Sequence, residues 1–395
     1  MSKKTEWKEA KVNLGGAIVA AAATLILGFF VGLNWSNFSV YLGANSKGKT
    51  VTADWSALNE VYSALASNYD GDLEKATLIE GAKKGLVDAV GDVYTVYMDK
   101  EESEEFEKSL HGDVGAGVGI EMGLRDGYIR VIRTLPDNPA RKAGILAGDI
   151  LYKVNGEEVY DLSTDEVATK IRGESGSSVT VTVVRDGEEL EFTMVRETIN
   201  NVSAYVDYRD NSAIITVTRF DTDTGTLVES FADEILNSDA KKIILDLRSN
   251  GGGYVSAARD LLSLWIDGEK ILVQKSQNAK DEITYAYSGR AKFANLKTVV
   301  LVNNNTASAS EIVTGALKDY KKATIIGETT YGKGVVQTLL DLSAGTTLKV
   351  TTAHWYTPLE NSINKVGIEP DVEVINTYED TNLSRDPQLD AALAY

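Results

Sequence analysis

Five short apolar runs separated by amphipathic segments constrain the fold of the second half of this chain more than any other feature. A continuous β-branched run suits a strand buried on both faces, and apolar residues at helical spacing suit a helix packed on a sheet. The strand-like runs are AIITVTRF, IILDLR, ILVQK, TVVLVN and ATIIG. Helical spacing covers residues 225–237, 254–266 and 309–321. The alternation predicts a layered α/β fold over about residues 199–375.

The junction between the TVVLV strand and the 309–321 helix carries a serine, Ser308. The first backbone N–H groups of a helix have no partner within it, and the positive end of the helix dipole lies there. Both favour negative charge, so an oxyanion formed on attack by Ser308 would find a donor in the Ala309 N–H. Serine is also a preferred N-cap, so Ser308 or Ser310 suits a purely structural cap as well.

A lysine in a glycine-bracketed turn, Lys333, follows in the segment YGKG. The chain has two histidines and no cysteine, so the usual pairings of a nucleophile with a base are nearly absent. A lysine activates a serine only when it is neutral, which requires burial or nearby positive charge. Gly332 and Gly334 let the backbone pack closely around it, and Gln337 lies on the same face of an extended strand. The alternative for Lys333 is an ordinary solvated side chain.

Two other kinds of site compete for this region. Residues 327–333 fit the first seven positions of a phosphate-binding loop, but Gly334 replaces the magnesium-binding hydroxyl and strands follow instead of a helix, which argues against a nucleotide site. A Ser-His-Asp triad would need His111, which is far away in sequence, or His354, which follows a strand. His354 stays open as a neighbour of the site.

A second glycine-rich turn lies at residues 251–253, after the predicted strand IILDL. Glycines at the carboxyl end of a strand let the backbone approach a ligand closely, and they also suit a tight strand–helix turn.

These motifs together resemble the carboxyl-terminal processing proteases, also called tail-specific proteases, which are Ser/Lys-dyad peptidases. The resemblance rests on TASASE, on YGKG, on the glutamine four residues after the lysine, and on DLRSNGGG. It implies that Ser308 is the nucleophile, Lys333 the general base and Gln337 the residue that orients the lysine, while Ser310 is left as a cap. It also implies that Gly252 or Gly253 joins Ala309 in the oxyanion hole. The core would then be of the crotonase- or Clp-like type.

The resemblance extends over about residues 55–395, and residues 112–198 resemble a PDZ domain. This region is β-rich with one short helix, and AGILAGDILYKVNG is its most diagnostic segment. The run Gly117-Val118-Gly119-Ile120 matches the carboxylate-binding loop, whose N–H groups would take up a chain terminus while the peptide adds as a strand. The partners implied are protein or peptide substrates with exposed C-termini.

The N-terminal segment 12–33 carries no charge and is long enough to span a bilayer, which takes about 20 residues. Four lysines precede it, so the positive-inside rule leaves the N-terminus in the cytoplasm and the rest outside. We expect an uncleaved anchor in preference to a cleaved signal peptide, because the apolar stretch exceeds the usual h-region. A cysteine-free extracytoplasmic part suits a bacterial envelope.

The expected organisation is therefore a cytoplasmic tail (1–11), a transmembrane anchor (12–33), a linker (34–54), a helical region (55–111), a PDZ domain (112–198) and a serine protease core with a closing strand and helix (199–395). A formal net charge of −18 argues against nucleic-acid partners, and the absence of cysteine excludes a thiolate metal site. No cofactor is implied. Related proteases dimerise through such helices, so the resemblance implies a homodimer. The rival interpretation is a catalytically silent PDZ adaptor that binds envelope protein tails.

Overall fold

The computed structural model describes residues 54–395 except 114, 126, 200, 378–379 and 381–384. The described residues fall into two units: one reaches Leu73 and includes Gln277–Lys280, and the other holds the rest. The predicted anchor at 12–33, with its tail and almost all of its linker, lies outside the described residues. Among the helices that are described, none combines the length and apolar character that crossing a bilayer requires.

The predicted helical region contains three helices. In the first unit, α3 (Ser56–Asn68) forms at the predicted spacing, but it buries no residue, and Leu58, Val61 and Tyr62 are exposed. In the second unit, α4 (Lys75–Asp88) precedes strand β1 (Val96–Met98), and α5 (Lys100–Leu110) follows it. Asp99 and Glu102 form a capping box that starts α5.

A central sheet of six strands forms the core of the α/β part. Its strand order is β10-β11-β12-β15-β16-β19, and every pairing from β11 onward is parallel. The strands are β10 (Ala204–Arg209), β11 (Ser212–Val217), β12 (Lys242–Asp246), β15 (Lys297–Val302), β16 (Thr324–Gly327) and β19 (Val372–Glu373). The apolar runs predicted four of these strands correctly, because strands covered on both faces carry apolar side chains throughout.

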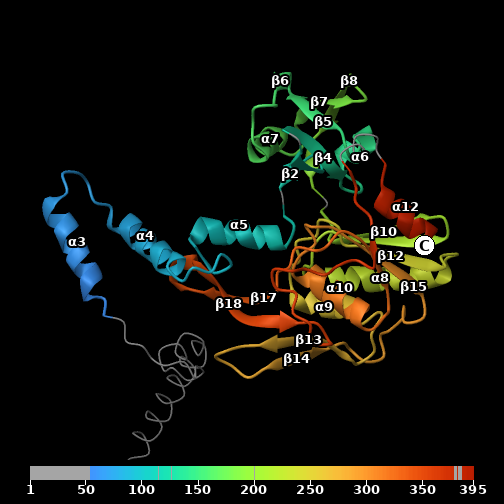
Figure 1. Ribbon diagram of the computed structural model, residues 1–395. Helices are drawn as coiled ribbons and strands as arrows, with labels where there is room; N and C mark the ends of the chain where they lie inside the picture. Colours follow the sequence, from blue (N-terminus) through green and yellow to red (C-terminus); the bar gives the residue numbers. More distant parts are fainter. Residues whose placement is uncertain (1–53, 114, 126, 200, 378–379, 381–384) are drawn as a thin grey trace, which may run out of the picture. The chain divides into compact units, whose positions relative to one another are not determined.

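Helices cover both faces of this sheet (Figure 1). Three of them, α8 (Thr224–Asn237), α9 (Val255–Leu262) and α10 (Ala309–Asp319), share one buried cluster with Ile215, Leu245 and Val300. The alternate strand residues Ile214, Ile244 and Val299 pack with α12 (Pro387–Ala394) on the other face. The prediction extended α9 to residue 266, but the helix ends at Leu262 and the apolar residues after it turn into the core. The crotonase- or Clp-like classification stays a prediction.

A second sheet is antiparallel and ends next to the candidate site. It contains β1, β13 (Lys270–Lys275), β14 (Glu282–Tyr285), β17 (Val335–Asp341) and β18 (Thr347–Tyr356). Strand β18 pairs with β1 through Val96 and Lys349, and with β17 along its whole length. The loop before β1 therefore lies across β18 from the start of β17, and the Gln337 side chain reaches it at Tyr94. A strand, β17, follows Lys333, as the sequence predicted.

The β-rich region between Ala116 and Thr198 has a hydrophobic core of its own, which includes Val131, Leu151 and Val181. Its sheet has the order β3-β4-β5-β7-β8, with β6 beside β5, and β2 pairs with β9. A second short helix, α6 (Pro139–Ala143), accompanies the expected α7 (Thr164–Ile171), because Pro139 starts it and Gly144 ends it in the left-handed conformation. The strands are β2 (Ala116–Gly117), β3 (Ile120–Arg125), β4 (Tyr128–Thr134), β5 (Ile150–Val154), β6 (Glu157–Glu158), β7 (Ser178–Arg185), β8 (Glu188–Val195) and β9 (Glu197–Thr198).

Candidate active site

Ser308 is the N-cap residue of α10 and adopts φ +57° and ψ −117°. Such a conformation costs a residue with a side chain about 1–3 kcal/mol and persists only where the surroundings impose it. Ser310 lies inside the helix and is not the cap: its hydroxyl donates to the Asn250 carbonyl at 3.0 Å. No hydrogen bond within the described part of the chain uses the N–H of Ala309. The serine therefore lies beside a backbone donor with no partner.

The glycine turn passes directly over this serine. A Cβ on Gly252 would lie 2.7 Å from the Ser308 Cβ, so only glycine fits there. The Gly252 N–H already donates to the Asn250 side-chain oxygen at 2.8 Å. The Gly253 N–H takes part in no hydrogen bond of the described residues, and this residue has φ +140°. Gly253 and Ala309 are thus the two residues of the predicted oxyanion hole whose N–H groups are free.

Asn250, which the sequence analysis missed, holds the turn against the helix. It is fully buried, and its side-chain amide donates to Val217 at 2.8 Å. Its carbonyl accepts from the Ala307 N–H at 3.0 Å as well as from Ser310. The two oxygens of Asn250 therefore connect the glycine turn at Gly252 to the residues on either side of Ser308.

Lys333 and Gln337 are brought together as predicted. The Lys333 ammonium donates to the Gln337 side-chain oxygen at 2.8 Å, and the Gln337 amide donates to the backbone carbonyl of Tyr94. The Tyr94 ring also faces the ammonium, 5.3 Å from its centroid. Burial lowers the pKa of Lys333, and the positive charge of Lys349 lowers it further, while Glu311 acts in the opposite direction. The sequence offered no signal for Tyr94, which precedes β1.

Glu311, also missed, connects the lysine turn to the serine. Its carboxylate is fully buried, and one oxygen accepts from the N–H groups of Ser308 and Lys333, both at 2.9 Å. The other oxygen accepts from the Gly332 N–H at 2.7 Å and from the Thr330 hydroxyl at 2.6 Å. The sequence did carry a signal for Glu311, because the spacing S-x-x-E that starts at Ser308 is typical of a capping box.

The structure does not join every candidate. No hydrogen bond of the residues described links the Ser308 hydroxyl to the Lys333 ammonium, which is held by Gln337 instead. Both histidines are exposed: His111 ends α5, and His354 lies on β18. Within the described part of the chain, neither ring is hydrogen-bonded to Ser308.

Three family models match this chain. Residues 211–374 match peptidase family S41, residues 131–185 a PDZ domain, and residues 23–102 the N-terminal domain of the activating protease CtpB. The carboxy-terminal processing protease CtpA of Bacillus subtilis is 34% identical over 382 residues, which cover 96% of this chain and 78% of that protein. A probable CtpA-like serine protease of Staphylococcus aureus (strain MSSA476) is 32% identical over 369 residues, which cover 93% of this chain and 72% of that protein.

Among solved structures, the photosystem II D1 C-terminal processing protease is similar, with a TM-score of 0.56 and 27% identity over 87% of this chain and 92% of that one. The chain belongs to the C-terminal processing proteases of family S41. It is accordingly a serine peptidase with a PDZ domain, as the sequence predicted.

The PDZ domain of this protease has a groove of about 370 Å³. All four residues of the predicted carboxylate-binding loop, 117–120, line it together with Ile171 and Ile199. Gly119 has φ +78°, and a Cβ there would lie 2.3 Å from the Asn138 Cβ, so the loop conformation depends on glycine.

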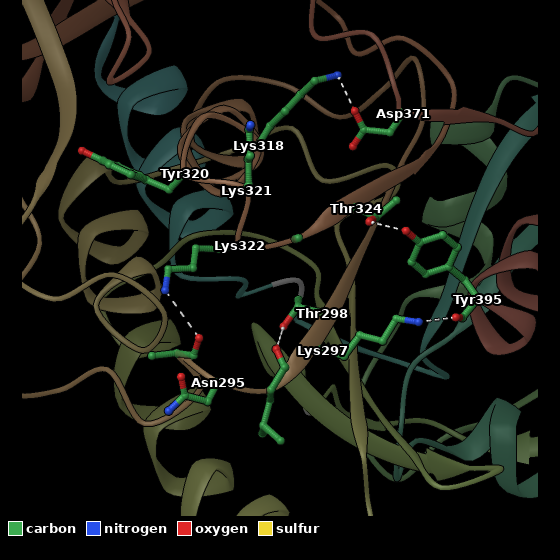
Figure 2. Close-up of a pocket in the computed structure, with 13 residues that line it drawn as sticks. Asn295, Lys297, Thr298, Lys318, Tyr320, Lys321, Lys322, Thr324, Asp371 and Tyr395 are labelled. Atoms are coloured by element: carbon green, nitrogen blue, oxygen red, sulfur yellow. Dashed lines mark hydrogen bonds and ion pairs between the residues drawn. The ribbon is translucent and has the colours of Figure 1, made fainter.

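A larger hollow of about 830 Å³ is lined in part by Lys318, Tyr320 and Thr324 (Figure 2). It adjoins the start of β15 and the end of α10, opposite to the ends that meet at Ser308. Lys318 pairs there with Asp371 at 3.1 Å, and Lys297 donates to the Tyr395 backbone oxygen. Lys318, Lys321 and Lys322 lie at the carboxyl end of α10, where positive charge is favourable, and neither Ser308 nor Lys333 lines the hollow.

Proposed function

We propose that this protease is an endopeptidase that cleaves by a Ser308/Lys333 dyad. The observation that carries the proposal is the environment of Lys333: its amine is partly buried, held by Gln337 and unpaired with any carboxylate among the described residues. Burial lowers the pKa of this lysine, which favours the neutral amine that a general base requires. Glu311 supports the same proposal, because it holds the backbones of both residues.

In the proposed reaction, the Lys333 amine turns from Gln337 to the Ser308 hydroxyl once substrate is bound. Lys333 takes the hydroxyl proton while Ser308 Oγ forms a bond to the peptide carbonyl carbon. The N–H groups of Ala309 and Gly253 stabilise the oxyanion, since the Gly252 N–H is already bonded to Asn250. Lys333 then protonates the leaving amine as the peptide C–N bond breaks. A water molecule, deprotonated by Lys333, hydrolyses the ester and releases Ser308.

The PDZ groove supports a substrate class of protein chains with exposed C-termini. The Gly117–Ile120 loop would bind the terminal carboxylate, and the apolar side chains of the groove would bind the adjacent residues. We further propose that residues 12–33 anchor the protease, with its catalytic part outside the cytoplasmic membrane of a bacterium. A homodimer would cover the exposed apolar side chains of α3, whose face has no cover among the described residues.

The test incubates the full chain with an unfolded protein and identifies the products by mass spectrometry, in parallel with Ser308→Ala and Lys333→Ala. We expect cleavage by the wild type and at least a ~10³-fold loss in each variant, with unchanged circular dichroism. Near-wild-type turnover by Lys333→Ala would refute the dyad. Absence of cleavage by the wild type together with tight binding of C-terminal peptides would favour the adaptor.

A further inference from the structure

Lys349 is a second partly buried lysine beside the catalytic one. It lies on β18, and its ammonium faces the Phe106 ring of α5 at 5.0 Å from the centroid. It forms no ion pair or hydrogen bond through its side chain with any residue in the described ranges. Burial lowers the pKa of Lys349, and no ion pair among the described residues offsets this effect.

The pairing of β17 with β18 locates this charge. Gln337 is opposite Thr351, and Leu339 is opposite Lys349, so Gln337 and Lys349 lie on the same face of the sheet as diagonal neighbours. Diagonal neighbours on adjacent strands are about 7–8 Å apart. Because Gln337 holds the Lys333 ammonium, the two lysines share one patch beneath the loop that precedes β1.

The charged groups around the two lysines differ. Lys333 lies near Glu311 and faces the ring of Tyr94, which in turn lies near Tyr331 and shares a loop with Asp92. The elements packed on Lys349 carry Asp341 on β17 and, on α5, five glutamates together with Lys100 and Lys108. Of the ion pairs described, Glu102 is used by Lys84 and Glu104 by Lys100. Acidic side chains outnumber basic ones on the elements around Lys349, but none of them forms an ion pair with it among the described residues. Lys333 has the buried carboxylate of Glu311 near it.

We propose that Lys349 is a positioning residue for the general base: its fixed positive charge keeps the Lys333 amine in the neutral form that accepts the Ser308 proton. This inference rests on the proposed dyad. Two ammonium groups repel each other across the patch, so the state with one charge, carried by Lys349, is favoured. Consistently, burial lowers the pKa of both lysines, and the positive charge of Lys349 lowers the pKa of Lys333 further.

The experiment measures kcat/KM from pH 5 to pH 10 for wild type, Lys349→Met, Lys349→Gln and Lys349→Arg. The substrate is an N-acetylated peptide with a free C-terminus and no ionisable side chain. We expect the acidic limb to move to higher pH by about 0.4 to 1.5 units in both neutral variants. This range takes the diagonal spacing of ~8 Å between Gln337 and Lys349 as the separation of the two charges, at an effective dielectric of 80 to 20. The plateau at high pH should persist, and Lys349→Arg should keep the wild-type limb. High salt should reduce the shift of the acidic limb between wild type and the two neutral variants.

Lys321→Met is the matched control, because Lys321 is exposed beyond the far end of α10 and lies away from the site. It should leave the profile unchanged. An unshifted limb in Lys349→Met and Lys349→Gln would overturn the inference, and so would a uniform loss at all pH values, which indicates a structural role. A change confined to KM would assign Lys349 to substrate binding instead. Activity in Lys333→Ala would refute the dyad itself, which separates the two failures.

Discussion

Replacing Glu311 by glutamine removes one buried charge while keeping the shape of the side chain. The carboxylate accepts four hydrogen bonds, three from backbone N–H groups and one from Thr330. A glutamine amide has one oxygen, so its NH₂ group must face two of these donors. The Thr330 hydroxyl can rotate to accept, whereas a backbone N–H cannot. One or two backbone N–H groups, depending on how the amide is oriented, are then left without an acceptor.

Each orphaned buried donor costs about 1–3 kcal/mol, so Glu311→Gln should destabilise the fold by roughly 1–6 kcal/mol. The orphaned groups belong to the turns that carry Ser308 and Lys333, so kcat should fall more than KM rises. Denaturant unfolding and steady-state peptide cleavage measure the two effects. Glu373→Gln, at an exposed position on β19, is the control. Wild-type stability and wild-type kcat in Glu311→Gln would refute the assigned connecting role.

Two further predictions follow from the same site. Lys333→Met should abolish activity yet raise the melting temperature at pH 7. The pKa of Lys333 is lowered in the folded state, so its protonation opposes folding at pH values below the ordinary lysine pKa of about 10.4. This destabilising effect fades as the pH rises through that range. Scanning calorimetry at pH 7 and pH 10 should therefore show a larger gain at pH 7; an equal or lower melting temperature there would contradict the shift. Gly252→Ala should reduce kcat at least ~10²-fold, because the alanine Cβ would lie 2.7 Å from the Ser308 Cβ. A peptide-cleavage assay measures this loss. Wild-type turnover in the variant would show that the glycine turn can move to accept a side chain.

Local pattern was enough to predict most of the elements. The strands at the IILDL and TVVLV segments and the α8 and α10 helices lie within a few residues of the predicted ranges, because burial on one or both faces leaves a periodic apolar signal. The prediction missed α6 because so short a helix shows no periodicity. It made α9 too long because the buried residues Leu264, Trp265 and Ile266 continue the apolar pattern after the helix has ended.

The site divides in the same way. Ser308, Lys333 and Gln337 were proposed from the sequence because each belongs to a compact motif whose spacing is local. The partners that complete them are distant in the chain: Tyr94 meets Gln337 across 243 positions, and Ser310 bonds Asn250 across 60. Such contacts leave no periodic trace in the sequence.

By itself, the sequence determined most strands and helices of the core and the family with its PDZ domain, and it proposed the residues that can do chemistry. Secondary structure and motif spacing depend on nearby side chains, which is why the sequence was enough for them. Only the tertiary structure decided which glycine N–H is free, where the lysine amine is held, and which second lysine lies beside it. These are questions of hydrogen-bond partners and of charges within about 8 Å, and both are set by how strands far apart in the chain come together.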